Sequence, residues 1–150
     1  MPVLRNTAMV EQVEMNDRIT GFVLKQSDYR EADVILSVLT KEYGKLSFVA
    51  QGVRKMTSKN AGSIMPYTKT EILFDYNETK TIFRLKNARC KDYYRSMHED
   101  ITASSAAAVA AELIDVLTLQ ASSDMTNSDE YAFLDIVFSK LDQGYDPTLV

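Results

Sequence analysis

Three basic residues that could hold phosphate groups gather in a polar segment just after a glycine. Gly52 is followed by Arg54, Lys55 and Lys59, with serine and threonine between them. Guanidinium and ammonium groups in such a loop stay hydrated and can contact phosphates without reading bases. The pattern therefore predicts a loop that holds a polyanion rather than a site that breaks a bond. An ordinary solvated loop is the alternative.

A second set of cations alternates along a predicted strand. Lys80, Arg84 and Lys86 share one face of the segment 80–87, and Lys45 follows a predicted tight turn. Because alternate residues of a strand point to the same face, these side chains could extend a track of phosphate contacts. A plain solvent-facing strand is the alternative that stays open.

Aromatic residues could add base stacking to such a surface. Tyr29, Tyr43 and Tyr67 flank predicted loops, where an exposed ring could stack on a nucleobase. Phe48 and Phe83 alternate with the apolar residues of their segments. We expect these two rings in the core.

Residues that could carry catalysis or bind a metal are few. Cys90 is the single cysteine and His98 the single histidine, so neither an internal disulfide nor a cysteine zinc site can form within the chain. Three clustered acids, Asp28, Glu31 and Asp33, are expected to organise a loop through ion pairs. Phosphoryl transfer usually needs several carboxylates that converge on metal ions. We expect no catalytic residue, no metal, no cofactor and no enzymatic activity.

Charge is divided unevenly along the chain. Residues 18–95 hold fifteen Lys and Arg against eight Asp and Glu, whereas residues 96–150 hold one against ten. The overall charge of −4 hides this asymmetry. Such a division indicates a nucleic-acid face on the first segment, with a basic strand region beside an acidic helical one as the alternative.

The elements that must position these residues fall into a β half and an α half, so the predicted class is α+β. Predicted strands cover 19–26, 33–40, 46–53, 69–76 and 80–87. Gly44 supplies positive φ for a tight turn. Five short strands without crossover helices predict a five-stranded antiparallel barrel.

The α half is predicted to begin at Ser96, where Ser96 and Glu99 fit a capping box. Apolar residues then recur at helical spacing: Val109, Leu113, Val116 and Leu117 in one helix, and Tyr131, Leu134, Val137, Phe138 and Leu141 in the next. We predict an N-terminal extension over 1–16, a β domain over 17–95 and a partial helical domain over 96–150. The chain shows no signal peptide and no membrane segment, which favours the cytoplasm.

The order of several short motifs resembles a known family. These are GFVL at 21–24, DYREAD at 28–33, LTKEYGK at 39–45, VAQGVRK at 49–55, Ser58 and MPY at 65–67. Together they resemble the N-terminal domain of the bacterial recombination-repair family RecO, over about residues 18–120. The resemblance implies an OB-fold followed by a helical domain.

The resemblance also implies a function and partners. These are binding of single- and double-stranded DNA, annealing of complementary strands, and loading of RecA onto DNA coated by single-strand-binding protein, with RecR as partner and a cytoplasmic, nucleoid-associated location. The alternative is an OB-fold interaction module whose helices dock a protein and which binds little DNA itself.

Three departures from the family pattern bear on these expectations. Gln51 stands where the family usually carries Lys or Arg, about fifteen residues precede the usual start, and the family's helical domain runs further, often with a cysteine zinc module. The chain is then either a piece of a longer protein or naturally short. With fewer helices to cover the apolar stripes, we expect self-association through residues 101–142.

Overall fold

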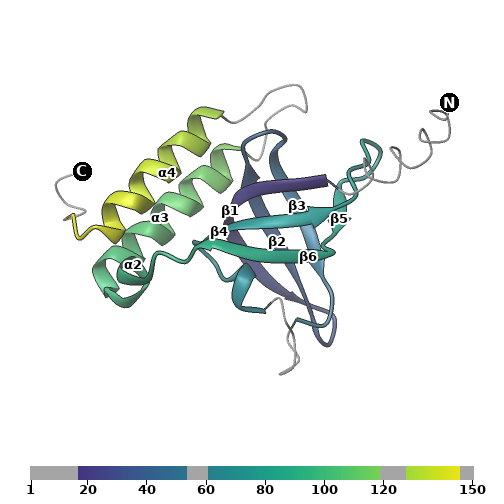
Figure 1. Cartoon of the computed structure of the whole chain (residues 1–150), viewed down its shortest axis with the longest axis horizontal. Helices are drawn as coiled ribbons and strands as arrows, with labels where there is room; N and C mark the ends of the chain where they lie inside the picture. The colour runs from purple at the N-terminus through teal and green to yellow at the C-terminus, as the bar shows by residue number, and fades with distance from the viewer. Residues whose placement is uncertain (1–16, 54–60, 119–127, 146–150) are drawn as a thin grey trace, which may run out of the picture.

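The protein is an α+β molecule in which three helices lie against one side of a curled sheet (Figure 1). The computed structural model describes residues 17–53, 61–118 and 128–145. The strands are β1 (Asp17–Tyr29), β2 (Asp33–Thr40), β3 (Gly44–Ala50), β4 (Lys69–Phe74), β5 (Ile82–Arg84) and β6 (Asn87–Asp92). The helices are the 3-10 turn η1 (Ala61–Ile64), α2 (Arg95–Glu99), α3 (Ile101–Leu117) and α4 (Ser128–Asp142). No helix in these described stretches is long and apolar enough to cross a membrane.

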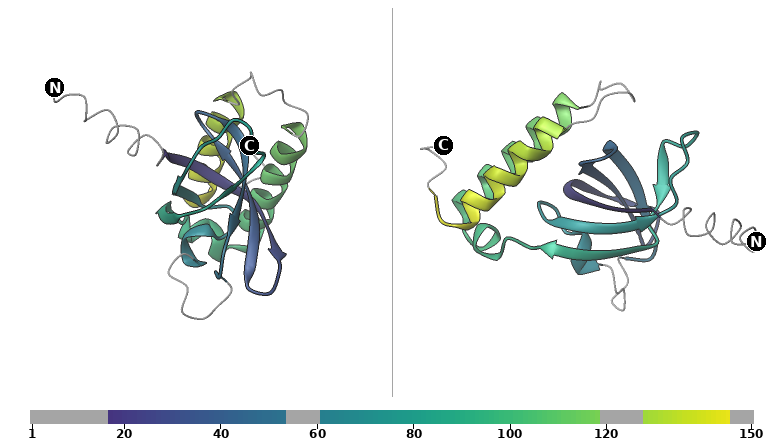
Figure 2. Two further views of the ribbon diagram at one scale, coloured as in Figure 1. Left: turned by 90° about the vertical axis from the view of Figure 1, so that its right-hand side faces the viewer. Right: turned by 45° about the horizontal axis from the view of Figure 1, so that its top comes forward.

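The sheet has six strands in the order β5-β3-β2-β1-β4-β6, which corrects the predicted five-stranded antiparallel barrel. Neighbouring strands are antiparallel except β3 and β5, which are parallel. The predicted strand 80–87 is split because the chain changes edges there. The Leu85 N–H donates to the Val49 carbonyl of β3 (3.0 Å), whereas the Lys86 N–H donates to the Leu73 carbonyl of β4 (2.9 Å). The sheet therefore curls until its edges approach, as Figure 2 shows, but its strand order stays open.

The first core fills the inside of the curl. Phe48, Phe74 and Phe83 meet there with ring centroids 5.0–6.1 Å apart, and all three are buried. The expectation that Phe48 and Phe83 belong to the core is confirmed. Gly21 allows β1 to cross β2 closely, since a Cβ there would lie 2.6 Å from Val38 Cγ1.

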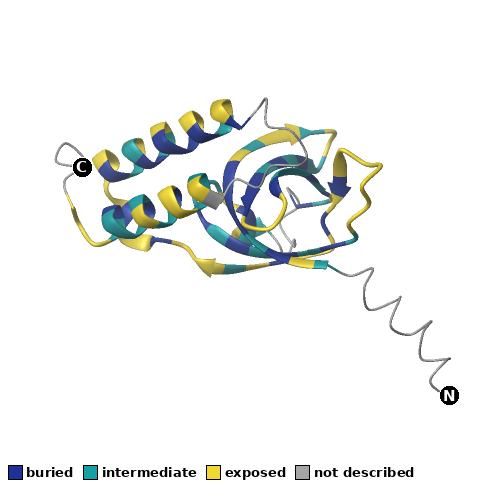
Figure 3. Ribbon diagram, turned by 90° about the horizontal axis from the view of Figure 1, so that it is seen from above, coloured by how far each residue is buried: buried dark blue, intermediate teal, exposed yellow. Residues whose placement is uncertain are grey.

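A second core joins the sheet to the helices. Phe22 and Leu24 point out of the curl from β1, while Val23 points into it. The Phe22 ring lies edge-on to Phe138 of α4 at 5.5 Å and tilted against Tyr131 at 4.9 Å. Both faces of β1 are therefore covered, and the helices share a core with the strands (Figure 3).

The capping box predicted at Ser96 is wrong, although a helix begins one residue earlier, at Arg95. The short helix α2 begins after Tyr94, whose side chain makes no capping bond, and the backbone becomes extended again at Asp100. Asp100 caps the long helix α3, because its Oδ1 accepts from the N–H groups of Thr102 (2.8 Å) and Ala103 (3.0 Å). Ser96 lies inside α2 and does not form the predicted capping box.

The apolar face predicted for the first long helix is also wrong. Its four residues are between 51% and 69% exposed: Val109, Leu113, Val116 and Leu117. The buried face instead carries small residues and one isoleucine: Ala103, Ala107, Ala110, Ala111 and Ile114. Small side chains let α3 approach its neighbours closely, so its backbone rather than its large side chains sits at the interface. The stripe of α4 is confirmed, with Leu134, Phe138 and Leu141 buried.

Candidate nucleic-acid interface

Three of the predicted cations line one hollow of about 210 Å³ beside β5. Lys80, Arg84 and Lys86 line it together with Asp75 and Phe83. The alternation of β5 places Phe83 inward and Arg84 outward. Lys80 is positioned by a turn in which its N–H donates to the Asn77 carbonyl at 3.0 Å. The structure thus brings together side chains from the turn, β5 and the segment that follows it.

The charges in this hollow are only partly neutralised. Lys86 Nζ lies 2.8 Å from Asp75, in a pair with both side chains more than a third exposed. Among the described residues, Lys80 and Arg84 form no ion pair, and both are exposed. With three cations and one carboxylate, the hollow carries a net positive charge that a phosphate could neutralise.

Lys45 occupies a different position from the other predicted cations. Its Nζ lies 3.0 Å from both the carboxylate and the backbone carbonyl of Asp115, and its side chain is mostly buried. This contact ties β3 to the end of α3. A phosphate would have to compete with Asp115 for this ammonium group.

The loop cations Arg54, Lys55 and Lys59 lie outside the described residues. The structure does show how the chain enters this segment. Gly52 adopts φ of 69°, and its N–H donates to Asp33 Oδ1 at 2.8 Å. Asp33 therefore anchors the turn that follows β3.

The three candidate stacking tyrosines differ in what covers their rings. Arg30 lies 4.8 Å from the centre of the Tyr29 ring. Tyr67 is half-buried against the second core, and its ring stacks on that of His98 with centroids 6.5 Å apart. Tyr43 is exposed and stacks on Tyr76 at 4.6 Å. Partial burial of the ring, followed by the nearby charge of Asp17, raises the pKa of Tyr43.

Tyr76 was placed within the predicted strand 69–76, but β4 ends at Phe74 and Tyr76 is exposed. Its N–H donates to Asp17 Oδ2 at 2.9 Å, which pins the chain after the strand. The adjoining turn sequence from Asn77 was the signal that the strand pattern had already ended.

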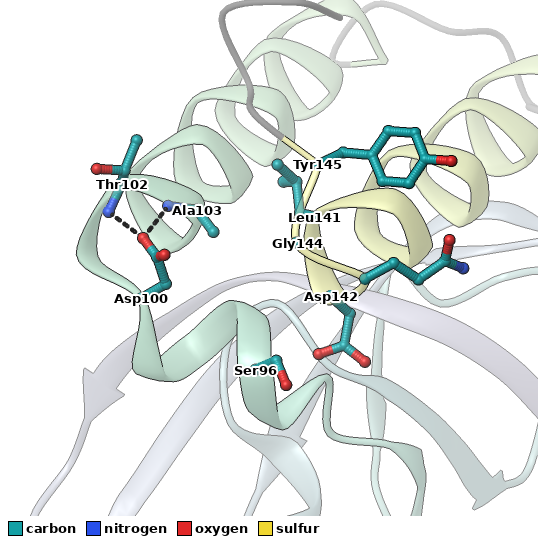
Figure 4. A pocket seen from close by; sticks show the side chains of 9 residues that line it. Ser96, Asp100, Thr102, Ala103, Leu141, Asp142, Gly144 and Tyr145 are labelled. Atoms are coloured by element: carbon teal, nitrogen blue, oxygen red, sulfur yellow. Dashed lines mark hydrogen bonds between the residues drawn. The ribbon is translucent and has the colours of Figure 1, made fainter.

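The hollow of about 440 Å³ between α2, α3 and α4 does not resemble a phosphate site (Figure 4). Asp100 and Asp142 are its charged lining residues, and both serve as hydrogen-bond acceptors for helix ends. Asp142 Oδ1 accepts from the N–H of Met97 at 3.0 Å. This acidic hollow belongs to the packing of the helices.

The single histidine and cysteine occupy structural positions. The ring nitrogens of His98 lie 3.1 Å from the Tyr94 carbonyl oxygen and 3.0 Å from that of Pro66, and the ring stacks on Tyr93. Burial raises the pKa of the Cys90 thiol, which disfavours the reactive thiolate. Within 17–53, 61–118 and 128–145, no group of three or more His, Cys, Asp or Glu could hold a metal.

Comparison with known proteins decides the family. Residues 15–94, more than half of the chain, match the family described as "Recombination protein O N terminal". The chain belongs to the RecO family. The observed sheet is consistent with the OB-fold of the RecO N-terminal domain.

Similar curated proteins share one name. The DNA repair protein RecO of Heliobacterium modesticaldum is 36% identical over 101 residues, which cover 67% of this chain and 36% of that protein. RecO of Leuconostoc mesenteroides is 32% identical over 135 residues, or 88% of this chain and 50% of that protein. RecO of Listeria welshimeri is 27% identical over 134 residues, which cover 89% of this chain and 51% of that protein. This RecO-family chain thus spans about half or less of the length of these relatives.

Proposed function

We propose that this chain binds single- and double-stranded DNA through phosphate contacts and acts as a recombination mediator without an active site of its own. The observation that carries the proposal is the hollow at β5, where Lys80 and Arg84 are exposed and carry no ion pair among the described residues. Membership of the RecO family supports it. Arg54, Lys55 and Lys59 remain predicted phosphate contacts of the same kind.

Annealing follows from the electrostatics of such contacts. Cations that neutralise the phosphates of one strand leave its base edges free and reduce its repulsion of a second strand. Phosphate contacts carry no sequence information, so any sequence preference should be slight. We further propose, from the family resemblance, that RecR and single-strand-binding protein are partners and that the chain helps to load RecA, in the cytoplasm at the nucleoid.

The salt dependence of DNA binding tests the electrostatic proposal. If about five phosphates are contacted, the log of the affinity should fall against log salt with a slope of about −3.5 for single strands and about −4.5 for duplex. The measurement is a titration of fluorescently labelled oligonucleotides at several salt concentrations. Binding that ignored salt, or an absence of binding at low salt, would contradict the proposal.

A second candidate role, protein interaction through the helices, rests on the outer face of α3 and α4. Leu113 and Val116 line a shallow hollow with Tyr67, and Leu113 also lines a neighbouring hollow with Phe133 of α4. Exposed apolar patches of this kind usually mark interfaces. We propose that a second copy of the chain covers this face.

Sedimentation at micromolar concentration checks the proposed self-association. We expect a dimer for the unmodified chain and a monomer for the variant Leu113→Glu, because a buried charge would oppose the contact. Lys25→Glu, which changes an exposed charge on β1 outside both hollows, is the control. A chain that sediments as a monomer throughout would exclude the dimer.

A further inference from the structure

The backbone of Tyr43 is hydrogen-bonded within the turn between β2 and β3. The buried Thr40 hydroxyl donates to the Gly44 carbonyl at 2.7 Å and accepts from the Tyr43 N–H at 2.9 Å. Gly44 adopts φ of 71°, which favours glycine. The ring is therefore presented by a turn whose backbone is already fixed, so little ordering would be lost if a ligand bound to it.

Three aromatic rings form a stepped column that leads from this turn toward the core. Tyr43 and Tyr76 stack at 4.6 Å with an interplanar angle of 15°, and Tyr76 stacks on Phe83 at 5.5 Å and 24°. Phe83 is buried, whereas Tyr76 is 41% and Tyr43 37% exposed. The column therefore runs from Phe83, buried in the core, to Tyr43 at the surface.

The same column adjoins the basic hollow, because Phe83 belongs to both. It stacks on Tyr76 and lines the hollow with Lys80 and Arg84. Asp17 accepts a hydrogen bond from the Tyr76 N–H, so a carboxylate lies beside the column. A phosphate would be repelled there, whereas the face of an uncharged nucleobase would not.

We propose that the Tyr43–Tyr76 pair is a base-stacking subsite, in which an unpaired nucleobase stacks on the column while the adjacent phosphates lie over Lys80 and Arg84. The inference rests on the proposed DNA-binding function and deepens it. Bases within a duplex already stack on their neighbours, so this subsite gives the chain a preference for single strands that phosphate contacts alone do not supply.

A structural role for Tyr43 predicts a different result. Its ring also lies edge-on to the buried Phe74, with ring centroids 6.4 Å apart, so its role could be limited to shielding the core from solvent. Leucine would still shield the core from solvent but offers no aromatic ring for stacking, whereas phenylalanine keeps the ring. The variants Tyr43→Leu and Tyr43→Phe therefore separate base stacking from shielding of the core.

The test measures the affinity of the full chain and both variants for three probes at one salt concentration. These are a single-stranded oligothymidine, an abasic strand with the same number of phosphates, and a duplex. We expect Tyr43→Leu to weaken binding of oligothymidine by about 5- to 100-fold, leaving the abasic strand and the duplex unchanged. Tyr43→Phe should bind all three as the unmodified chain does.

Other outcomes overturn the inference in distinguishable ways. Unchanged binding of oligothymidine by Tyr43→Leu would show that the ring makes no contact with bases. An equal loss on all three probes would assign Tyr43 a structural role. Failure of the unmodified chain to bind any probe would refute the proposed function itself, and the stacking subsite with it.

Discussion

Phe22→Ala is expected to lower the free energy of unfolding by about 3–5 kcal/mol. Phe22 is completely buried and contacts two aromatic residues of α4. Its ring joins β1 to α4 through Phe138 and Tyr131, so truncation leaves a cavity in the second core. The neighbouring backbone cannot collapse into this space, because the opposite face of β1 is packed inside the curled sheet.

Urea denaturation followed by circular dichroism measures this effect. Ile136→Ala on α4 is the control, since it also truncates a large apolar side chain, but one that is 56% exposed and lines neither hollow of the proposed dimer face. We expect the control to cost less than about 1 kcal/mol. If the two variants lost similar stability, Phe22 would not be the contact that holds the helices to the sheet.

The double variant Lys80→Glu with Arg84→Glu is expected to weaken DNA binding on the order of tenfold to a hundredfold at low salt. Two attractive contacts with phosphates would be replaced by two repulsive ones. The slope of log affinity against log salt for single strands should also become shallower by about 1.4, since each lost contact contributes about 0.7. Fluorescence titration at several salt concentrations measures both quantities.

A matched control separates the hollow from the net charge of the chain. Lys25→Glu with Lys91→Glu changes the net charge by the same amount at two exposed lysines of β1 and β6, outside the hollow. We expect this control to lose much less affinity. Equal losses in the two double variants would mean that the overall field, and not the hollow at β5, drives binding. Thermal unfolding of each variant checks that the fold is retained.

Local patterns in the sequence predicted most of the strands. The segment 33–40 is the strand β2 with the predicted limits, because its apolar and β-branched residues have no helical period. Gly44 adopts the predicted positive φ. The apolar face of α4 was also predictable from the sequence, since Leu134, Phe138 and Leu141 recur at helical spacing, and all three are buried.

The sixth strand and the crossing at Leu85 and Lys86 were not predictable from local patterns. These consecutive residues donate to two strands that are remote in the sequence, β3 and β4. Whether a short segment joins one edge or the other depends on how far the sheet curls. That curl depends on contacts such as the close approach of Gly21 to Val38.

The face by which α3 packs was decided by tertiary structure. Hydrophobicity alone favoured the face with Val109 and Leu113, yet the alanine face is buried. The spacing of apolar residues shows that a helix is amphipathic. The space between the packed elements decides whether its large or its small side chains face the neighbour.

The candidate site divides in the same way. The sequence by itself determined the family, the uneven charge, and the cations Lys80, Arg84 and Lys86 on one segment. The ion pair of Lys45 with Asp115 and the stacking of Tyr43 on Tyr76 were decided by the tertiary structure, because each contact joins residues from separate elements. Side-chain type and spacing along one strand are local properties, whereas the partner of a charge or a ring is set by the long-range packing of the sheet and helices.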